Sequence, residues 1–118
     1  MRQVLMVDDD PGQLRIREII LRNAGLTANL ATDAVAALSC LRAKIGEIGL
    51  LVTDHNLPGC SGAELVREAR IIAPTLPMVV LTGMPGIESE YEGMDVMFCF
   101  KPMPPGEFIE LIQRFLGQ

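Results

Sequence analysis

The sequence predicts an α/β fold in which helices cover both faces of a five-stranded parallel sheet. Short apolar runs alternate with helical patterns five times along the 118 residues. Most of these runs are continuously apolar, as is typical of parallel strands that are buried on both faces. The alternation of strand and helix indicates a doubly wound arrangement. No linker or repeat interrupts the pattern, so we expect one domain over residues 1–118.

The elements can be placed in order from their apolar residues. Strands are expected near residues 4–7, 27–31, 50–53, 78–81 and 96–100. The first helix should span residues 11–24 and end at Gly25, and the second should begin at Thr32 or Asp33 as its N-cap. The apolar faces of the four clear helices contain Leu14, Ile16, Ile19, Ile20 and Leu21; Val35, Leu38, Leu41 and Ile45; Leu65, Val66, Ala69 and Ile72; and Phe108, Leu111, Ile112, Phe115 and Leu116.

The segment between the last two strands differs from the other connections. Residues 83–95 contain Pro85, Gly86 and Gly93 and few apolar side chains. Proline and glycine weaken a helix interior. Any fourth helix should therefore be short or irregular, over about residues 87–92.

Composition excludes several classes of protein. The net charge is −5 and the ten basic residues are scattered, which argues against a direct nucleic-acid interface. Three distant cysteines favour reduced thiols in a cytoplasmic protein. No apolar stretch approaches the roughly 20 residues that span a bilayer. The chain enters a strand at once and finishes after its last helix, so we expect no signal peptide and no output domain.

Charged and hydroxyl side chains follow four of the expected strands. Asp8 and Asp9 follow the first, Asp54 the third, Thr82 the fourth and Lys101 the fifth. The carboxyl ends of parallel strands lie at one edge, where ligands bind. Carboxylates about 4 Å apart repel by roughly 4 kcal/mol at an effective dielectric near 20, so the cluster needs a bound cation.

This set of groups suits phosphoryl transfer. Magnesium prefers one or two carboxylates together with waters and phosphate oxygens, as Asp8, Asp9 and Asp54 would supply. A carboxylate can form an aspartyl phosphate, and a lysine ammonium can contact a phosphoryl oxygen. Gly83, directly after Thr82, has no side chain that would obstruct an incoming group.

The motifs in combination resemble a response-regulator receiver domain of two-component signalling, of the CheY-like fold type. They are Asp8-Asp9, residues 53–59 with Gly62, Leu81-Thr82-Gly83 and Phe100-Lys101-Pro102. The resemblance covers the whole chain and implies the strand order 2-1-3-4-5. It also implies a signalling switch rather than an enzyme, with self-dephosphorylation that is at most slow.

The resemblance implies a role for each site residue. Asp54 would accept a phosphoryl group from a histidine kinase or phosphotransfer protein, and Lys101 would contact that group. A Mg²⁺ ion would bind Asp9, Asp54 and the main-chain carbonyl of Asn56, with Asp8 acting directly or through water. The switch towards a downstream effector protein would involve Thr82, Gly83, Phe98 and Pro102, with the Lys101-Pro102 peptide bond in the cis form.

Three features depart from the family pattern. Phe98 lacks the hydroxyl of the commoner tyrosine, and the stretch from Thr82 to Lys101 is shorter than usual. The short stretch weakens the dimer face that many members build there, so we expect a monomer or weak dimer. Met84 lies where the family modulates hydrolysis of the phosphoryl group.

Alternative interpretations remain at this stage. The chain could be a receiver segment of a larger hybrid kinase or regulator, or a pseudo-receiver that only binds partners. A small phosphatase is a further alternative, but the sequence offers no material for a substrate-binding cap. We expect His55, the single histidine, to be an exposed loop residue at the rim of the site. Cys60 should be a small loop residue, and Asp10 a helix cap.

Overall fold

A single parallel sheet forms the centre of the computed structural model, which describes residues 2–117; Met1 and Gln118 lie outside the described residues. Its strands are β1 (Gln3–Val7), β2 (Ala28–Ala31), β3 (Ile48–Asp54), β6 (Met78–Thr82) and β7 (Met97–Phe100). The spatial order is β2-β1-β3-β6-β7, and every neighbouring pair is parallel. The expected order is confirmed, because β6 and β7 are the fourth and fifth strands of this sheet.

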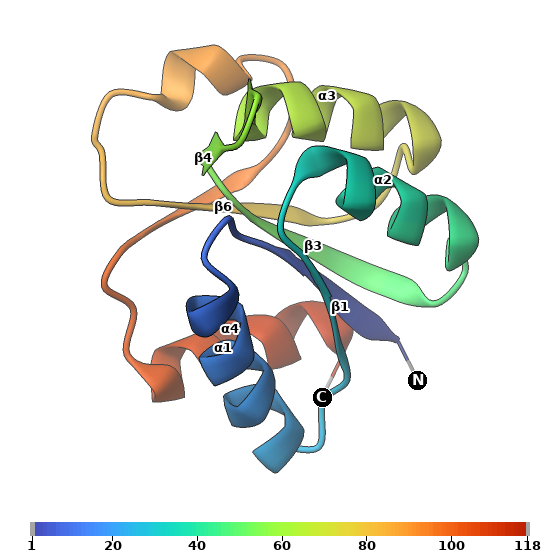
Figure 1. Cartoon of the computed structure of the whole chain (residues 1–118), viewed down its shortest axis with the longest axis vertical. Helices are drawn as coiled ribbons and strands as arrows, with labels where there is room; N and C mark the ends of the chain where they lie inside the picture. The colour runs from blue at the N-terminus through green and yellow to red at the C-terminus, as the bar shows by residue number, and fades with distance from the viewer. Residues whose placement is uncertain (1, 118) are drawn as a thin grey trace.

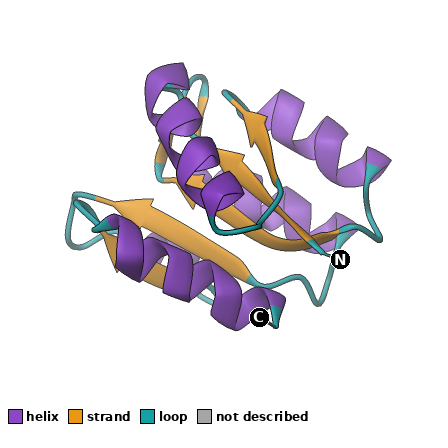
Figure 2. Ribbon diagram, turned by 90° about the horizontal axis from the view of Figure 1, so that it is seen from below, coloured by secondary structure: helices purple, strands orange, loops and turns teal. Residues whose placement is uncertain are grey.

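Helices cover both faces of the sheet (Figures 1 and 2). They are α1 (Pro11–Asn23), α2 (Ala34–Ala43), α3 (Gly62–Ile72) and α4 (Pro105–Leu116). Helices α1 and α4 pack on one face, and α2 and α3 on the other. Two separate apolar clusters result, which explains why β1, β3 and β6 each contain an unbroken run of apolar residues.

Local signals set the helix ends. Asp10 caps α1 by accepting hydrogen bonds from the amides of Gly12 and Gln13, at 2.9 and 3.3 Å. Asp33 caps α2 through the amide of Ala36 at 2.7 Å, which selects it over Thr32. After α1 the chain turns at Gly25, whose φ of +80° is a conformation that glycine adopts without strain.

Several side chains expected in the core are exposed. Ile16 and Ile19 on α1 are 53% and 43% exposed, whereas Leu14 and Leu21 are buried. At 3.6 residues per turn, Ile16 lies roughly 200° around the helix from Leu14, so the two cannot face the same core. Ile45 is also exposed, because α2 ends at Ala43.

The connection between β6 and β7 contains one turn of 3₁₀ helix, η1 (Glu88–Tyr91). The expectation of a short helix at about residues 87–92 is thus confirmed. Arg70 of α3 fastens the end of this connection by donating to the carbonyl oxygens of Met94 and Asp95 at 3.1 and 3.0 Å. The same guanidinium donates to the carbonyl of Leu76 at 2.6 Å, so one side chain holds both the segment before β6 and the segment before β7.

The loop expected after β3 contains a short antiparallel hairpin, β4 (Asn56–Leu57) with β5 (Cys60–Ser61). Gly59, at φ +74°, makes its turn. Within residues 2–117, no helix combines the length and the apolar character needed to cross a membrane.

Candidate functional site

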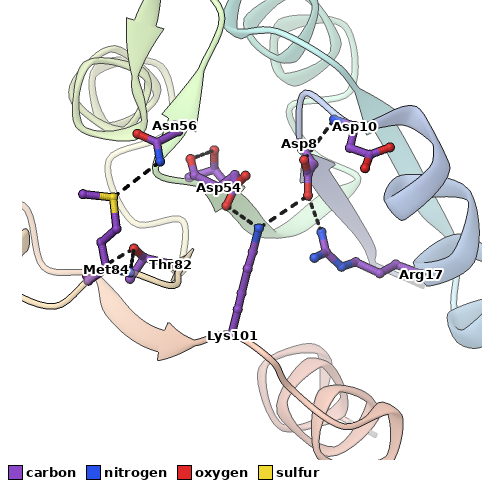
Figure 3. A network of polar contacts seen from close by, with 9 residues as sticks. Asp8, Asp10, Arg17, Asp54, Asn56, Thr82, Met84 and Lys101 are labelled. Carbon is purple, nitrogen blue, oxygen red and sulfur yellow. Dashed lines mark hydrogen bonds and ion pairs between the residues drawn. The ribbon is translucent and has the colours of Figure 1, made fainter.

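The strand register places the expected residues at one edge of the sheet (Figure 3). Val7 pairs with Thr53, so Asp8 and Asp54 are the next residues of adjacent strands. On the other side of β3, Asp54 pairs with Leu81, and Thr82 pairs with Phe100. Lys101 therefore follows β7 at the same edge of the sheet, two residues beyond Cys99, which is level with Leu81 and Asp54.

Three carboxylates and one ammonium group meet at this edge. Lys101 Nζ lies 2.7 Å from Asp54 Oδ1 and 3.8 Å from Asp8 Oδ2. Asp8, Asp9 and Asp54 each offer a carboxylate oxygen, and these oxygens all lie within 4.8 Å of one another. Asp8 is buried, Asp54 is partly buried and Asp9 is exposed. The structure thus brings together the acidic residues and the lysine that the sequence singled out.

Arg17 of α1 belongs to the cluster although sequence reasoning did not select it. Its Nη1 atom donates to Asp8 Oδ2 at 2.8 Å, and its side chain is only 16% exposed. The sequence offered only a weak signal for this role, which is that Arg17 lies about two turns into a helix that begins directly after an aspartate cluster. Its side-chain direction depends on how α1 packs on the sheet, which the local sequence does not specify.

The environments of Asp8 and Asp54 shift the pKa values of their carboxyls in opposite directions. Burial raises the pKa of Asp54 above its ordinary value, and the hydrogen bond from Lys101 offsets this only in part. Burial also acts to raise the pKa of Asp8. The hydrogen bonds from the Asp10 amide and Arg17, together with the charge of Lys101, outweigh burial and hold the pKa of Asp8 below its ordinary value.

The donor set fits a hard divalent cation. All three acidic side chains offer oxygen, the ligand type that Mg²⁺ prefers, and one of them is open to solvent. Three carboxylates that meet two basic groups leave one negative charge in excess among these residues. Asn56 lies on β4, two residues after Asp54, at the same end of the sheet.

The hydroxyl of Thr82 is engaged by its own loop. Its Oγ1 atom accepts a hydrogen bond from the Met84 amide at 2.9 Å and donates to the Met84 carbonyl at 3.3 Å. Met84 Sδ also accepts a hydrogen bond from the Asn56 side chain at 3.7 Å (Figure 3). Beside Thr82, a Cβ atom added at Gly83 would meet nothing within 4 Å, so the approach is open.

The expectations for Pro102 and Phe98 have separate outcomes. The Lys101-Pro102 peptide bond is cis, as predicted. The half-buried ring of Phe98 packs edge-on against Tyr91, with ring centroids 5.2 Å apart. A role for either residue as a switch stays a prediction.

The expectation for His55 is wrong, because its side chain is buried rather than exposed, with a relative exposure of 6%. Its Nδ1 atom lies 2.8 Å from the hydroxyl of Tyr91. The partner is 36 residues further along the chain, so no local pattern could indicate the contact. Cys60 is half-buried, and burial together with the charge of Glu64 raises the pKa of its thiol, which disfavours the reactive thiolate.

The doubly wound sheet with this acidic edge places the chain in the CheY-like class of α/β folds. Residues 4–113 match the family model of the response regulator receiver domain. The chain belongs to that family. Receiver domains are signalling domains of two-component systems, in which they interact with histidine kinases and effectors.

Individual proteins show the same likeness. An uncharacterized 14.6 kDa protein of Leptolyngbya boryana is 32% identical over 117 residues, which cover 95% of this chain and 88% of that protein. The cell cycle response regulator CtrA of Brucella ovis is 28% identical over 97% of this chain and 50% of its own length. The chain thus spans about half the length of CtrA.

Solved structures agree with the fold. The chemotaxis protein CheY4 of Vibrio cholerae has a TM-score of 0.88 at 25% identity, over 98% of both chains. The receiver domain of the hybrid histidine kinase CckA has a TM-score of 0.82 at 28% identity, covering 97% of this chain and 98% of that one.

Proposed function

We propose that this receiver domain is a phosphoacceptor switch that takes a phosphoryl group from a phosphohistidine onto Asp54. The observation that carries the proposal is the position of Asp54: its Oδ1 atom lies 2.7 Å from Lys101 Nζ, next to two further carboxylates. A salt bridge alone would not require the extra acidic groups, which repel one another. A site that binds a cation and a phosphoryl group uses all of them.

In the proposed reaction, a carboxylate oxygen of Asp54 forms a bond to phosphorus. The bond from phosphorus to the donor imidazole nitrogen breaks, and its electron pair returns to the imidazole ring. Lys101 moves its contact from the carboxylate to a phosphoryl oxygen and balances part of the charge. Burial raises the pKa of Asp54 in the metal-free site, because its surroundings solvate the carboxylate weakly.

Asp8, Asp9, Asp54 and the main-chain carbonyl of Asn56 would hold the Mg²⁺ ion. When bound, the ion would neutralise charge on the phosphoryl oxygens. Arg17 and Lys101 already balance part of the acidic charge, so the three carboxylates can remain close together before a cation arrives.

A groove beside the site suits docking of the phosphodonor protein. It encloses about 390 Å³ between α1 and the start of α4, and Lys101 is one of the residues that line it. Its walls are mostly apolar and include Ile16, Ile20, Met103, Pro105 and Phe108. The exposure of Ile16, which the helical pattern had assigned to the core, is explained if a partner covers it.

The proposed switch begins at Thr82. A phosphoryl group adds about −1.5 to −2 charges at neutral pH and three strong acceptor oxygens. Thr82 can donate its hydroxyl to one of these oxygens only by giving up its hydrogen bond to the Met84 carbonyl. The loop that begins at Gly83 would therefore rearrange and present a changed surface to the effector.

Incubation with acetyl phosphate and Mg²⁺, followed by intact-mass measurement, tests the phosphoacceptor. We expect one phosphoryl adduct in the wild-type chain and none in Asp54→Asn or in the presence of EDTA. The matched control is Asp95→Asn, because Asp95 is exposed and its φ of 53° suits asparagine. An adduct that persists in Asp54→Asn would contradict the assignment, and a wild-type chain without any adduct would favour the pseudo-receiver.

Substitution in the groove separates docking from chemistry. Ile16→Ser is expected to slow phosphotransfer from a phosphohistidine protein while labelling by acetyl phosphate stays unchanged, since the small donor needs no groove. Equal loss with both donors would place the effect in the site itself and contradict the docking surface.

A further inference from the structure

A buried histidine next to the phosphoacceptor is not explained by the proposed chemistry. His55 follows Asp54 directly, and its ring contacts Tyr91. The two rings lie 5.7 Å apart between centroids, and the hydrogen bond between Nδ1 and the hydroxyl measures 2.8 Å. Both side chains are buried, at 6% and 3% exposure. Burying two polar groups is unfavourable unless they pair, so the contact is a specific one.

The carboxylate of Glu90 lies near the other ring nitrogen of the histidine. Glu90 Oε2 lies 3.5 Å from Nε2 of His55. In the tautomer that carries its proton on Nε2, this proton faces the carboxylate and Nδ1 accepts from the Tyr91 hydroxyl. Two consecutive residues of η1 thus hold the two nitrogens of one ring. This contact attaches the connection between β6 and β7 to the end of β3.

Tyr91 also closes the base of the β4–β5 hairpin. The amide of Gly62 donates to the carbonyl of His55 at 2.6 Å, so these two residues form the neck of the hairpin. A Cβ atom at Gly62 would lie 2.6 Å from the Tyr91 hydroxyl and 2.7 Å from the carbonyl oxygen of Asp54. The Tyr91 hydroxyl therefore packs closely against Gly62, whose other neighbours are the main-chain atoms of Asp54 and His55.

The far side of Tyr91 contacts the last strand. Its ring meets Phe98 of β7 edge-on at 5.2 Å, the geometry that aromatic pairs prefer. Phe98 lies opposite Val80 of β6, two residues before Thr82. A continuous set of contacts runs from Asp54 through His55 and Tyr91 to the edge strand.

We propose that His55 and Tyr91 are positioning residues that transmit the state of Asp54 to η1 and β7. The inference rests on the proposed phosphoacceptor function. A shift of the Asp54 main chain moves His55, and the hydrogen bond requires Tyr91 and its turn to follow. The surface that changes is then formed by η1 and β7, where Met97 and Phe100 are exposed. A ligand shifts such an equilibrium only through its different affinity for the two arrangements.

The composition of the chain makes the test direct. Tyr91 is the single tyrosine and His55 the single histidine, so ¹³C at the tyrosine Cζ and ¹⁵N in histidine each label one residue. Beryllofluoride with Mg²⁺ serves as the phosphoryl substitute, and ¹⁹F NMR of the bound fluorides reports occupancy of the site independently. In the wild-type chain we expect the Cζ and ring nitrogen resonances to shift when the site fills.

Two variants break the contact in different ways. His55→Phe retains a buried ring and should reduce the Cζ shift to less than a third of the wild-type value. Tyr91→Phe removes one oxygen atom and retains the packing on Phe98, so it should fold. In this variant the shifts that beryllofluoride causes in the amide resonances of residues 96–100 should also fall to less than a third of their wild-type values. Both should bind beryllofluoride as the wild type does. Ser89→Ala, at an exposed position of the same turn, is the control and should leave all shifts unchanged.

The outcomes distinguish the two proposals. If the wild-type site does not bind beryllofluoride, the phosphoacceptor function fails and the inference fails with it. If the site fills but the Tyr91 resonance does not move, the inference alone is overturned. It is also overturned if Tyr91→Phe responds at residues 96–100 as strongly as the wild type, because the hydrogen bond then transmits nothing.

Discussion

Arg17 offers a sharp test of the electrostatics of this site. Its guanidinium holds Asp8 Oδ2 at 2.8 Å and would lie beside any cation that shares this carboxylate. We predict that Arg17→Gln increases the affinity for Mg²⁺. Glutamine retains polarity and much of the length of the side chain, so the main change is the loss of one positive charge.

The size of the effect follows from Coulomb's law. A divalent cation and a guanidinium roughly 7 Å apart repel by about 5 kcal/mol at an effective dielectric of 20, and by about 1 kcal/mol in bulk water. The site opens to solvent at the exposed Asp9, so the value should lie towards the lower limit. A gain of about 1.4 kcal/mol corresponds to a tenfold lower dissociation constant for Mg²⁺.

Isothermal titration calorimetry with Mg²⁺ alone measures this constant without a phosphodonor. Thermal unfolding supplies a second measurement. Without metal, Arg17→Gln should unfold at a lower temperature than the wild type, because Asp8 is 2% exposed and loses a partner. Adding Mg²⁺ should raise the unfolding temperature of the variant more than that of the wild type. Arg15→Gln, an exposed position on the same helix, is the matched control.

An unchanged or weaker affinity in Arg17→Gln would refute this reasoning. It would mean that Arg17 orients Asp8 for the cation and does not compete with it. The same titration on Arg15→Gln separates a local effect from a general change in net charge, since both variants lose one positive charge.

Three further predictions concern stability. Arg70→Met should lower the free energy of unfolding by about 3 kcal/mol, because carbonyls such as those of Leu76 and Met94 lose a charged donor. Urea denaturation measures this loss. A loss no larger than that of the exposed control Arg67→Met would contradict the prediction. Gly62→Ala should lower the free energy of unfolding by about 2 kcal/mol, because its Cβ atom would lie 2.6 Å from the Tyr91 hydroxyl. The control is Gly106→Ala, whose Cβ atom would meet nothing within 4 Å and which should be neutral or stabilising in the same assay. The third concerns pH in metal-free protein. Burial raises the native pKa of Asp54 above 3.8, so in this pH range the native carboxyl binds more protons than the unfolded one. The stability of the wild type relative to Asp54→Asn should therefore fall as the pH rises from 3.8 through the native pKa. A stability difference that grows with pH would be incompatible with this shift.

Much of the fold could be predicted from local patterns. Local sequence patterns were sufficient to locate the strands β1, β3 and β6 and the helix α4. Strands buried on both faces contain continuous apolar runs, and a helix buried on one side has apolar residues at a regular spacing. The helix caps were equally local, since a cap needs only a side chain and an amide two or three residues away. Periodicity was less reliable on α1, where Ile16 is apolar but faces outwards.

The charged edge of the site was also accessible from the sequence. In a parallel sheet the carboxyl ends of strands share one edge, so Asp8, Asp54 and Lys101 had to lie near one another once the strands were located. The direction of each strand follows from the alternation of strand and helix, and the strand order that the family resemblance implies places these ends next to one another.

Contacts that depend on side-chain direction between distant segments were decided only by the tertiary structure. Arg17 reaches Asp8 because α1 packs with that face over the sheet edge, and His55 meets Tyr91 because η1 brings Tyr91 next to the end of β3. Thr82 is turned towards Met84 for a similarly specific reason, the path of its own loop. The order of the residues determined which groups gather at the sheet edge. Packing between elements far apart in the chain determined which of them touch, since an interaction between two side chains depends on three-dimensional distance and not on sequence separation.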